Sequence, residues 1–129
     1  MSDKPKILLV DDEPSISKVV SKRLELAGFD VITAMDGQDA LQKAQNDHPD
    51  LIILDLMLPK LNGYEVCTML KGDARYRKMP IVMFSAKAQE KDEKLGNECG
   101  ADAYVTKPFQ AEVLVEQIKS LLAASGKGT

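Results

Sequence analysis

The stretch Leu51-Ile52-Ile53-Leu54-Asp55 decides the fold of this chain. Four consecutive apolar residues end on a carboxylate, and Pro49 and Pro59 bound the run. A short apolar run between residues that interrupt regular structure is typical of a β-strand buried on both faces. A carboxylate at the carboxyl end of such a strand lies where open parallel sheets bind their ligands. The stretch therefore predicts a central strand that places Asp55 at a site.

Three further apolar runs end in the same way, on residues that carry chemistry. Ile7–Val10 is followed by Asp11-Asp12, Ile81–Phe84 by Ser85, and Ala103–Thr106 by Lys107. The expected strands span 6–10, 29–34, 51–55, 81–85 and 103–106, and four of the expected helices span 14–27, 37–46, 88–98 and 110–123. The remaining helix, third in the chain, follows Asn62 and ends before the charged loop 73–79. Five strands that alternate with five helices predict an α/β fold with a parallel sheet covered on both faces.

Local signals mark the ends of several helices. Pro14 suits the first position of one helix, and Gly28 suits its end. Asp36 is placed to cap the second helix, and Asn62 with Glu65 has the spacing of a capping box. The apolar stripes expected to face the core include Val19 and Val20 in the first helix and Val66, Met69 and Leu70 in the third.

Composition narrows the class of protein. The 129 residues are 44% hydrophobic and 29% charged, with a net charge of −3, which argues against non-specific binding to nucleic acid. The first residues lack the apolar run of a signal peptide, and no run reaches transmembrane length. Cys67 and Cys99 lack CxxC spacing and are expected to be free thiols. These features favour a cytoplasmic protein.

The residues at the strand ends suggest phosphoryl chemistry. If the first and third strands are neighbours, the carboxylates of Asp11, Asp12 and Asp55 converge, and such a cluster needs protons or a cation. Hard oxygen ligands suit Mg²⁺, which often bridges to phosphate oxygens. Lys107 and the Ser85 hydroxyl approach the same edge and could contact phosphoryl oxygens, while Asp55 could be a carboxylate nucleophile.

Each of these residues also has a purely structural interpretation. Asp12 could only cap the first helix, and Asp55 could only accept hydrogen bonds from loop amides. Ser85 could be a turn hydroxyl, and Lys107 a solvated surface charge. His48, the single histidine, precedes Pro49 and is expected to be a solvated loop residue rather than a phosphotransfer histidine.

The chain resembles the receiver domain of bacterial two-component response regulators over about residues 5–123. The motifs that carry the resemblance are ILLVDDE, DLIILDLMLP, IVMFSA and GADAYVTKPF, which contain Asp55 and Lys107-Pro108-Phe109 at the family's spacing. It implies a doubly wound (βα)5, flavodoxin-like three-layer sandwich with strand order 2-1-3-4-5, an order adopted from the family rather than derived. It also implies one receiver domain over 1–129. The small and polar residues 124–129 are expected to form a flexible tail.

The resemblance assigns roles to individual residues. It implies that Asp55 accepts a phosphoryl group from the phosphohistidine of a sensor histidine kinase or a histidine phosphotransfer protein. Asp12, Asp55 and the backbone carbonyl of Met57 would bind Mg²⁺ directly, and Asp11 would bind it through water. Ser85 and Lys107 would contact the phosphoryl oxygens.

The resemblance also implies how phosphorylation would change the surface and which residues would set the lifetime of the phosphorylated state. Tyr104 would swing inward as Ser85 moves, which would change the face made by the segments 88–98, 103–106 and 110–123 and so control a downstream protein target. Pro108 would follow a cis peptide bond. Met57 and Lys87, two residues after Asp55 and Ser85, depart from the best-known chemotaxis members and would set the lifetime of the phosphorylated state.

Other readings remain open. The chain could be the receiver part of a longer DNA-binding response regulator. A haloacid-dehalogenase-type phosphatase also uses an aspartate nucleophile, but its DxDxT motif is absent. A flavodoxin-like cofactor binder would need a Ser/Thr/Gly-rich loop where Asp11-Asp12-Glu13 stands. We expect a non-enzymatic monomer or weak phosphorylation-dependent dimer, with no direct nucleic-acid contact and no membrane insertion.

Overall fold

The fold was examined in a computed structural model that describes residues 4–55, 58, 61–85, 100–106 and 110–124. Its strands are β1 (Lys6–Val10), β2 (Asp30–Ala34), β3 (Leu51–Asp55), β4 (Ile81–Ser85) and β5 (Ala103–Thr106). Its helices are α1 (Pro14–Leu26), α2 (Gly37–Asp47), α3 (Gly63–Lys71) and α5 (Ala111–Ala124). The helix expected over 88–98 lies outside the described residues.

The five strands form one parallel sheet in the order β2-β1-β3-β4-β5, as the resemblance implied. Strands β1 and β3 are direct neighbours, with Leu8 opposite Ile52 and Val10 opposite Leu54. Every residue of β3 is buried, which confirms the central, doubly covered strand predicted from its apolar run.

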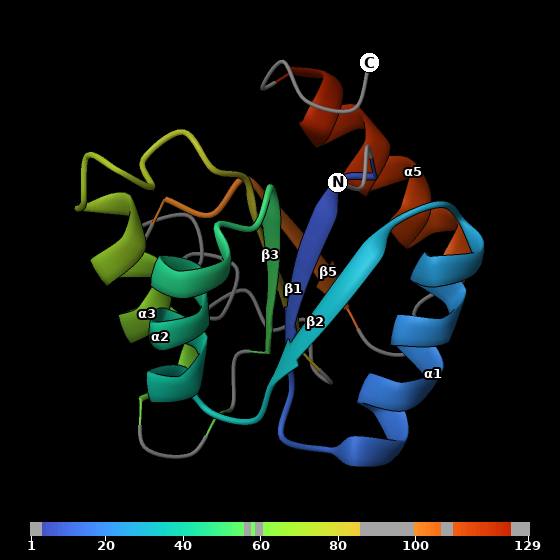
Figure 1. The fold of residues 1–129 in the computed structure, drawn as a ribbon, viewed down its shortest axis with the longest axis horizontal. Helices are drawn as coiled ribbons and strands as arrows, with labels where there is room; N and C mark the ends of the chain where they lie inside the picture. Colours follow the sequence, from blue (N-terminus) through green and yellow to red (C-terminus); the bar gives the residue numbers. More distant parts are fainter. Residues whose placement is uncertain (1–3, 56–57, 59–60, 86–99, 107–109, 125–129) are drawn as a thin grey trace.

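Helices cover both faces of this sheet, so the molecule has three layers (Figure 1). Alternate strand residues point to opposite faces, so Leu8 and Ile52 join one core cluster and Ile7 and Ile53 join the other. The first cluster packs under α2 and α3, and the second under α1 and α5. The α/β doubly wound architecture is therefore confirmed.

The helix ends follow the local signals in the sequence. Asp36 Oδ1 accepts a hydrogen bond from the Asp39 amide at 2.8 Å, so Asp36 caps α2 as predicted. Both bonds of the expected capping box of α3 are present, between Asn62 and Glu65. Gly28 follows the end of α1 with a φ of +101°, a conformation that glycine adopts without strain.

Two residues expected in the core stripes face solvent instead. Val19 is 63% exposed and Met69 is 52% exposed, whereas Ser17 and Cys67 are buried in the same helices. Each residue turns a helix by about 100°, so Val19 lies about 140° round α1 from the buried Leu24. By the same count Met69 lies about 160° round α3 from Cys67. The apolar residues of α1 and α3 therefore predicted a wider buried stripe than the one that packs on the sheet.

His48 ends α2 as an exposed residue, which agrees with the expectation of a solvated position. Its φ of 48° and ψ of 61° place it in the left-handed region, where it turns the chain towards Pro49 and β3. Among the described residues, no helix combines the length and apolar character needed to cross a membrane.

Candidate functional site: an acidic cluster at the carboxyl edge of the sheet

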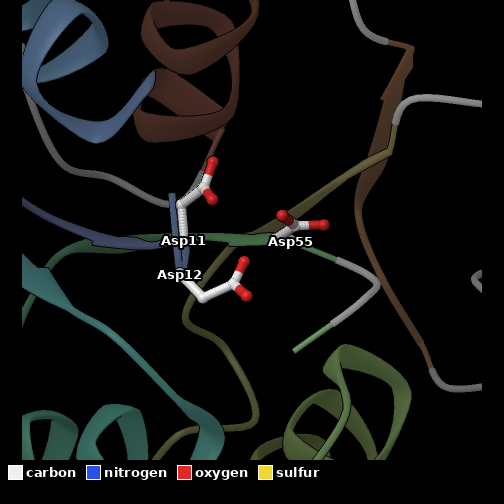
Figure 2. Close-up of side chains that lie close together, drawn as sticks. All are labelled: Asp11, Asp12 and Asp55. Carbon is white, nitrogen blue, oxygen red and sulfur yellow. The ribbon is translucent and has the colours of Figure 1, made fainter. Parts of the chain in front are cut away.

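Three carboxylates meet at the carboxyl ends of β1 and β3. Asp11 and Asp12 directly follow β1, and Asp55 is the last residue of β3. One oxygen of each of the three side chains lies within 4.8 Å of the others. Figure 2 shows the three side chains extending from the two neighbouring strand ends. The convergence predicted from the sequence is therefore present.

The three acids differ in their burial. Asp11 is 0% exposed and Asp55 is 5% exposed, whereas Asp12 faces solvent. Asp11 is held from both sides, because its amide donates to the Ala34 carbonyl at 3.1 Å and its Oδ1 accepts from the Glu13 amide at 2.9 Å. The cluster therefore has a buried base and an open, charged side.

The alternative that Asp12 only caps the first helix is wrong. The capping position of α1 is Glu13, with no hydrogen bond from its side chain to the helix, and Pro14 begins the helix. Pro14 has no amide hydrogen, so fewer free amides at this helix end need a partner. The Asp12 carboxylate is thus left to contribute to the cluster.

The donor set of the cluster fits a magnesium ion. Three carboxylates this close repel one another unless a cation or protons offset their charge. Ligand oxygens on opposite sides of an octahedral Mg²⁺ are about 4.2 Å apart, since each lies about 2.1 Å from the metal. The observed separations, within 4.8 Å, allow two acids to bind directly and a third through water. Carboxylate oxygens are also the hard ligands that this ion prefers.

Two further predicted residues lie on strands beside the cluster. Ser85 ends β4, whose Phe84 is opposite Asp55, so the backbone of Ser85 reaches the same edge of the sheet. Tyr104 lies in β5 opposite Met83 and is partly buried against the core cluster under α2 and α3. Of the other predicted site residues, Met57, Lys87, Lys107 and Pro108 lie outside the described residues.

Reasoning from the sequence passed over Gly37, which is buried at the start of α2 beside the loop that follows Asp55. The signal available in the sequence was slight: a glycine directly after a capping aspartate, in a position where helices tolerate many residues. Its importance comes from a contact with Leu61, which no local pattern predicts.

The chain matches the family model of the response regulator receiver domain over residues 7–119. It is 51% identical over 120 residues to the alkaline phosphatase synthesis transcriptional regulatory protein PhoP of Bacillus subtilis, covering 93% of this chain and 49% of PhoP. It is 40% identical over 119 residues to protein PilG of Pseudomonas aeruginosa, covering 92% of this chain and 88% of PilG. The chain thus spans about half the length of PhoP and of several other curated relatives.

Solved structures agree with these sequence relatives. The chemotaxis protein CheY4 of Vibrio cholerae superposes with a TM-score of 0.87 at 35% identity, covering 92% of this chain and 99% of CheY4. A signal receiver domain of a histidine kinase from Syntrophus aciditrophicus has a TM-score of 0.89 at 31% identity, covering 97% of this chain and 95% of that one. The motifs, the sheet order and these matches together show that the chain belongs to the response regulator receiver domain family of two-component signalling.

Proposed function

We propose that this receiver domain takes a phosphoryl group onto Asp55 from the phosphohistidine of a sensor histidine kinase or a histidine phosphotransfer protein. The observation that carries the proposal is the cluster of Asp11, Asp12 and Asp55, with oxygens within 4.8 Å, at the carboxyl edge of a receiver-type sheet. An Asp55 oxygen forms the new bond to phosphorus as the bond between phosphorus and the histidine nitrogen breaks. The imidazole leaves with the electron pair of that bond.

The neighbouring acids would help Asp55 to react by binding a cation beside it. A dianionic phosphoryl group approaches three carboxylates only if positive charge offsets their repulsion, and a bound Mg²⁺ supplies that charge. We assign Asp12, Asp55 and the backbone carbonyl of Met57 as direct ligands, and the buried Asp11 as a residue that acts through a bound water. The Asp12 carboxylate faces solvent, so an entering ion can reach it.

Ser85 and Lys107 complete the proposed site. Their hydroxyl and amine would contact the phosphoryl oxygens on Asp55, and Lys107 is followed by Pro108, whose peptide bond we expect to be cis. Movement of Ser85 towards the phosphoryl group would draw Tyr104 inward. The part of the surface made by residues 88–98, β5 and α5 would then change shape and alter the binding of a downstream protein.

The proposal is tested by phosphorylation with a small acyl phosphate and Mg²⁺, followed by intact-mass measurement. The wild type gains the mass of one phosphoryl group, and removal of Mg²⁺ with a chelator abolishes the gain. Asp55→Asn should show no gain. The matched control is Asp30→Asn, an aspartate at the opposite, amino end of β2, which should be labelled like the wild type. Full labelling of Asp55→Asn at another residue would contradict the assignment.

The same assay separates the roles of the two other acids. Asp12→Ala should raise the Mg²⁺ concentration needed for half-maximal labelling more than Asp11→Ala does, because only Asp12 is assigned as a direct ligand. Isothermal titration with Mg²⁺ gives the same ranking without phosphorylation. A larger effect of Asp11→Ala would reverse the assignment of direct and water-mediated ligands.

The partners of this switch are also part of the proposal. Receiver domains are signalling modules rather than classical enzymes, and we propose that this one catalyses only its own phosphorylation and dephosphorylation. It would act in the cytoplasm, with residues 1–129 forming a single domain that is a monomer or a weak dimer after phosphorylation. PilG is of similar length, so a separate protein target reached through the changed face fits this chain.

A second output is supported by other relatives. PhoP and RpaA are transcriptional regulators about twice the length of the matched region, and a receiver of this kind can be joined to a DNA-binding domain. In that case the receiver itself still makes no nucleic-acid contact, since its net charge is −3. Binding of phosphorylated residues 1–129 to double-stranded DNA in a gel-shift assay would contradict this part of the proposal.

A further inference from the structure

Gly37, the first residue of α2, packs closer to a neighbouring segment than any side chain would allow. A Cβ atom at this position would lie 2.4 Å from the Leu61 carbonyl oxygen and 2.5 Å from Leu61 Cβ. It would also lie 2.9 Å from Val66 Cγ2. Cβ contacts under 3.0 Å are essentially absent from real proteins, and the nearest atom here belongs to the backbone. Any other residue at position 37 must therefore move one of the two chain segments.

Among the described residues, both segments are fixed close to this contact. On one side, the Asp36 side chain caps α2 and fixes its first turn. On the other, Leu61 directly precedes the capping box of Asn62 and Glu65, which fixes the start of α3. Val66, the third contact, is 0% exposed in the core. A displacement would accordingly pass along the chain instead of ending in a side-chain rotation.

Both chain paths from this contact lead to an acid of the cluster. Three residues before Gly37, the Ala34 carbonyl accepts the hydrogen bond from the Asp11 amide at 3.1 Å. Along the other path, Leu61 follows Asp55 by six residues, and Leu58 between them is buried in the same core cluster as Val66. The contact at Gly37 therefore lies between the end of β2, which bonds to Asp11, and Leu61, which follows Asp55 by six residues.

We infer that Gly37 is a positioning residue for the acidic cluster. By letting the backbone of α2 lie directly against Leu61, it sets the separation between the Asp11 and Asp55 carboxylates, although it touches neither of them. Mg²⁺ demands nearly ideal octahedral geometry, so its affinity is sensitive to small changes in ligand spacing. The inference about metal affinity rests on the proposed function, whereas the inference about spacing does not.

The test compares Gly37→Ala with the wild type by two measurements on the full chain. The first is the amide chemical shifts of Asp11 and Asp55 without metal, and the second is the Kd for Mg²⁺ from isothermal titration. Gly37→Ala should shift both amides and raise the Kd about tenfold, as is typical for residues that orient metal ligands from a distance. Leu61→Gly in the Gly37→Ala background removes the overlap at Leu61 Cβ and should restore part of the affinity.

Two control variants distinguish an effect on the spacing of the acids from a general loss of stability. Gly72→Ala makes the same chemical change at the end of α3, where the added Cβ would lie 3.2 Å from the Thr68 carbonyl oxygen and φ is −78°. Ala44→Gly weakens α2 itself, at a core-facing position beyond its first turn. Both should leave the Kd for Mg²⁺ within twofold of the wild type.

The results decide whether Gly37 positions the acidic cluster. Unchanged amide shifts and an unchanged Kd in folded Gly37→Ala would overturn the inference, as would an equal loss of affinity in Ala44→Gly. Loss of folding in both Gly37→Ala and the double variant would overturn it too, since Gly37 would then be a requirement of the fold rather than of the site. If the wild type binds no Mg²⁺ while Gly37→Ala shifts the amides, the proposed function fails and the role in spacing stands.

Discussion

At the scale of single residues, Asp73 shows how one neighbour changes the chemistry of a side chain. The Arg75 side chain donates hydrogen bonds to both of its carboxylate oxygens, with Arg75 Nη2 2.8 Å from Asp73 Oδ2. The Arg75 amide also donates to Asp73 Oδ1 at 2.9 Å. These bonds favour the charged carboxylate and lower the pKa of Asp73 from 3.8 to about 2. The guanidinium also lies over the ring of Tyr76, 5.1 Å from its centre.

Arg75→Ala should raise the pKa of Asp73 most of the way back towards 3.8, since the side-chain hydrogen bonds are the largest cause of the shift. Because the folded pKa is depressed, the pair stabilises the fold above the unfolded pKa of 3.8 and loses this effect as the pH falls towards 2. An NMR titration of the Asp73 carboxyl carbon measures the shift. Arg77→Ala is the control and should leave the pKa of Asp73 unchanged. A pKa that stays at about 2 in Arg75→Ala would show that Arg75 is not the cause.

The lifetime of the phosphorylated state is a second prediction at this scale. In the proposed phosphorylated state, water would attack the phosphoryl group opposite the Asp55 oxygen, and we expect Met57 and Lys87 to border that route. Met57 has no strong group that holds a water molecule, and we expect the long, cationic Lys87 to lie over the phosphoryl oxygens. Met57→Asn with Lys87→Glu should shorten the half-life several-fold, which corresponds to about 1 kcal/mol of barrier.

Decay is followed by intact mass after removal of the phosphodonor, with Mg²⁺ kept saturating. Lys78→Glu, the same charge reversal in the loop before β4, is the control and should leave the half-life unchanged. A half-life that is unchanged or longer in the double variant would show that these two side chains do not limit access of water.

At the scale of helices and strands, Lys71 connects three parts of the chain. From the last turn of α3, its Nζ donates to the carbonyl oxygens of Arg77 at 3.2 Å and Met79 at 2.9 Å, in the loop before β4. It also forms an ion pair with Asp102 at 2.8 Å, just before β5. Asp102 in turn accepts a hydrogen bond from the Ile81 amide at 2.8 Å, at the start of β4. The Lys71 side chain is 15% exposed and the Asp102 side chain 36% exposed, so solvent partly screens this ion pair.

Lys71→Met should lower the free energy of unfolding by about 2 kcal/mol, because two carbonyl groups and a partly exposed carboxylate lose their shared donor. Urea denaturation measures the change. Lys22→Met, in an exposed position of α1, is the matched control and should change the stability by less than about 0.5 kcal/mol. Equal effects of the two substitutions would show that the network contributes nothing beyond the ordinary surface.

At the scale of the whole molecule, the sheet separates the site from the surface that we propose it controls. The acidic cluster lies at the ends of β1 and β3, in the middle of the sheet, while β5 lies at its edge. Tyr104 of β5 is partly buried against the same core cluster as Val10 and Leu54, the residues that lead into Asp11 and Asp55. A packed core of this kind can transmit a small displacement from the site to the edge strand.

Phosphorylation should therefore change amide hydrogen exchange at β5, where Tyr104 lies, and at α5 more than at α2. A stable mimic of the phosphoryl group, bound with Mg²⁺, allows the exchange to be measured at equilibrium by mass spectrometry. Asp55→Asn under the same conditions is the control and should show no change. Changes confined to α1 and α2, with none near Tyr104, would refute the proposed output face.

Much of this architecture was predictable from short stretches of sequence. The apolar runs located β1, β3, β4 and β5, and the capping residues Asp36 and Asn62 located the starts of α2 and α3. These features depend on residues within one strand or one helical turn, whose intrinsic preferences act before any tertiary contact. The three acids were also recognisable, because each directly follows or ends a strand.

Contacts between segments far apart in the chain were decided by the tertiary structure alone. The order of the strands came from family resemblance, since nothing within a strand specifies its neighbour. Asp11 and Asp12 are adjacent in sequence, yet Asp11, whose amide bonds to the Ala34 carbonyl at the end of β2, is fully buried, and Asp12 faces solvent. The pair Lys71–Asp102 and the contact of Gly37 with Leu61 join residues that no local pattern relates. The spacing of apolar residues predicts which face of a helix is buried, but the width of that buried face depends on what packs against it. Val19 and Met69 therefore remain exposed to solvent.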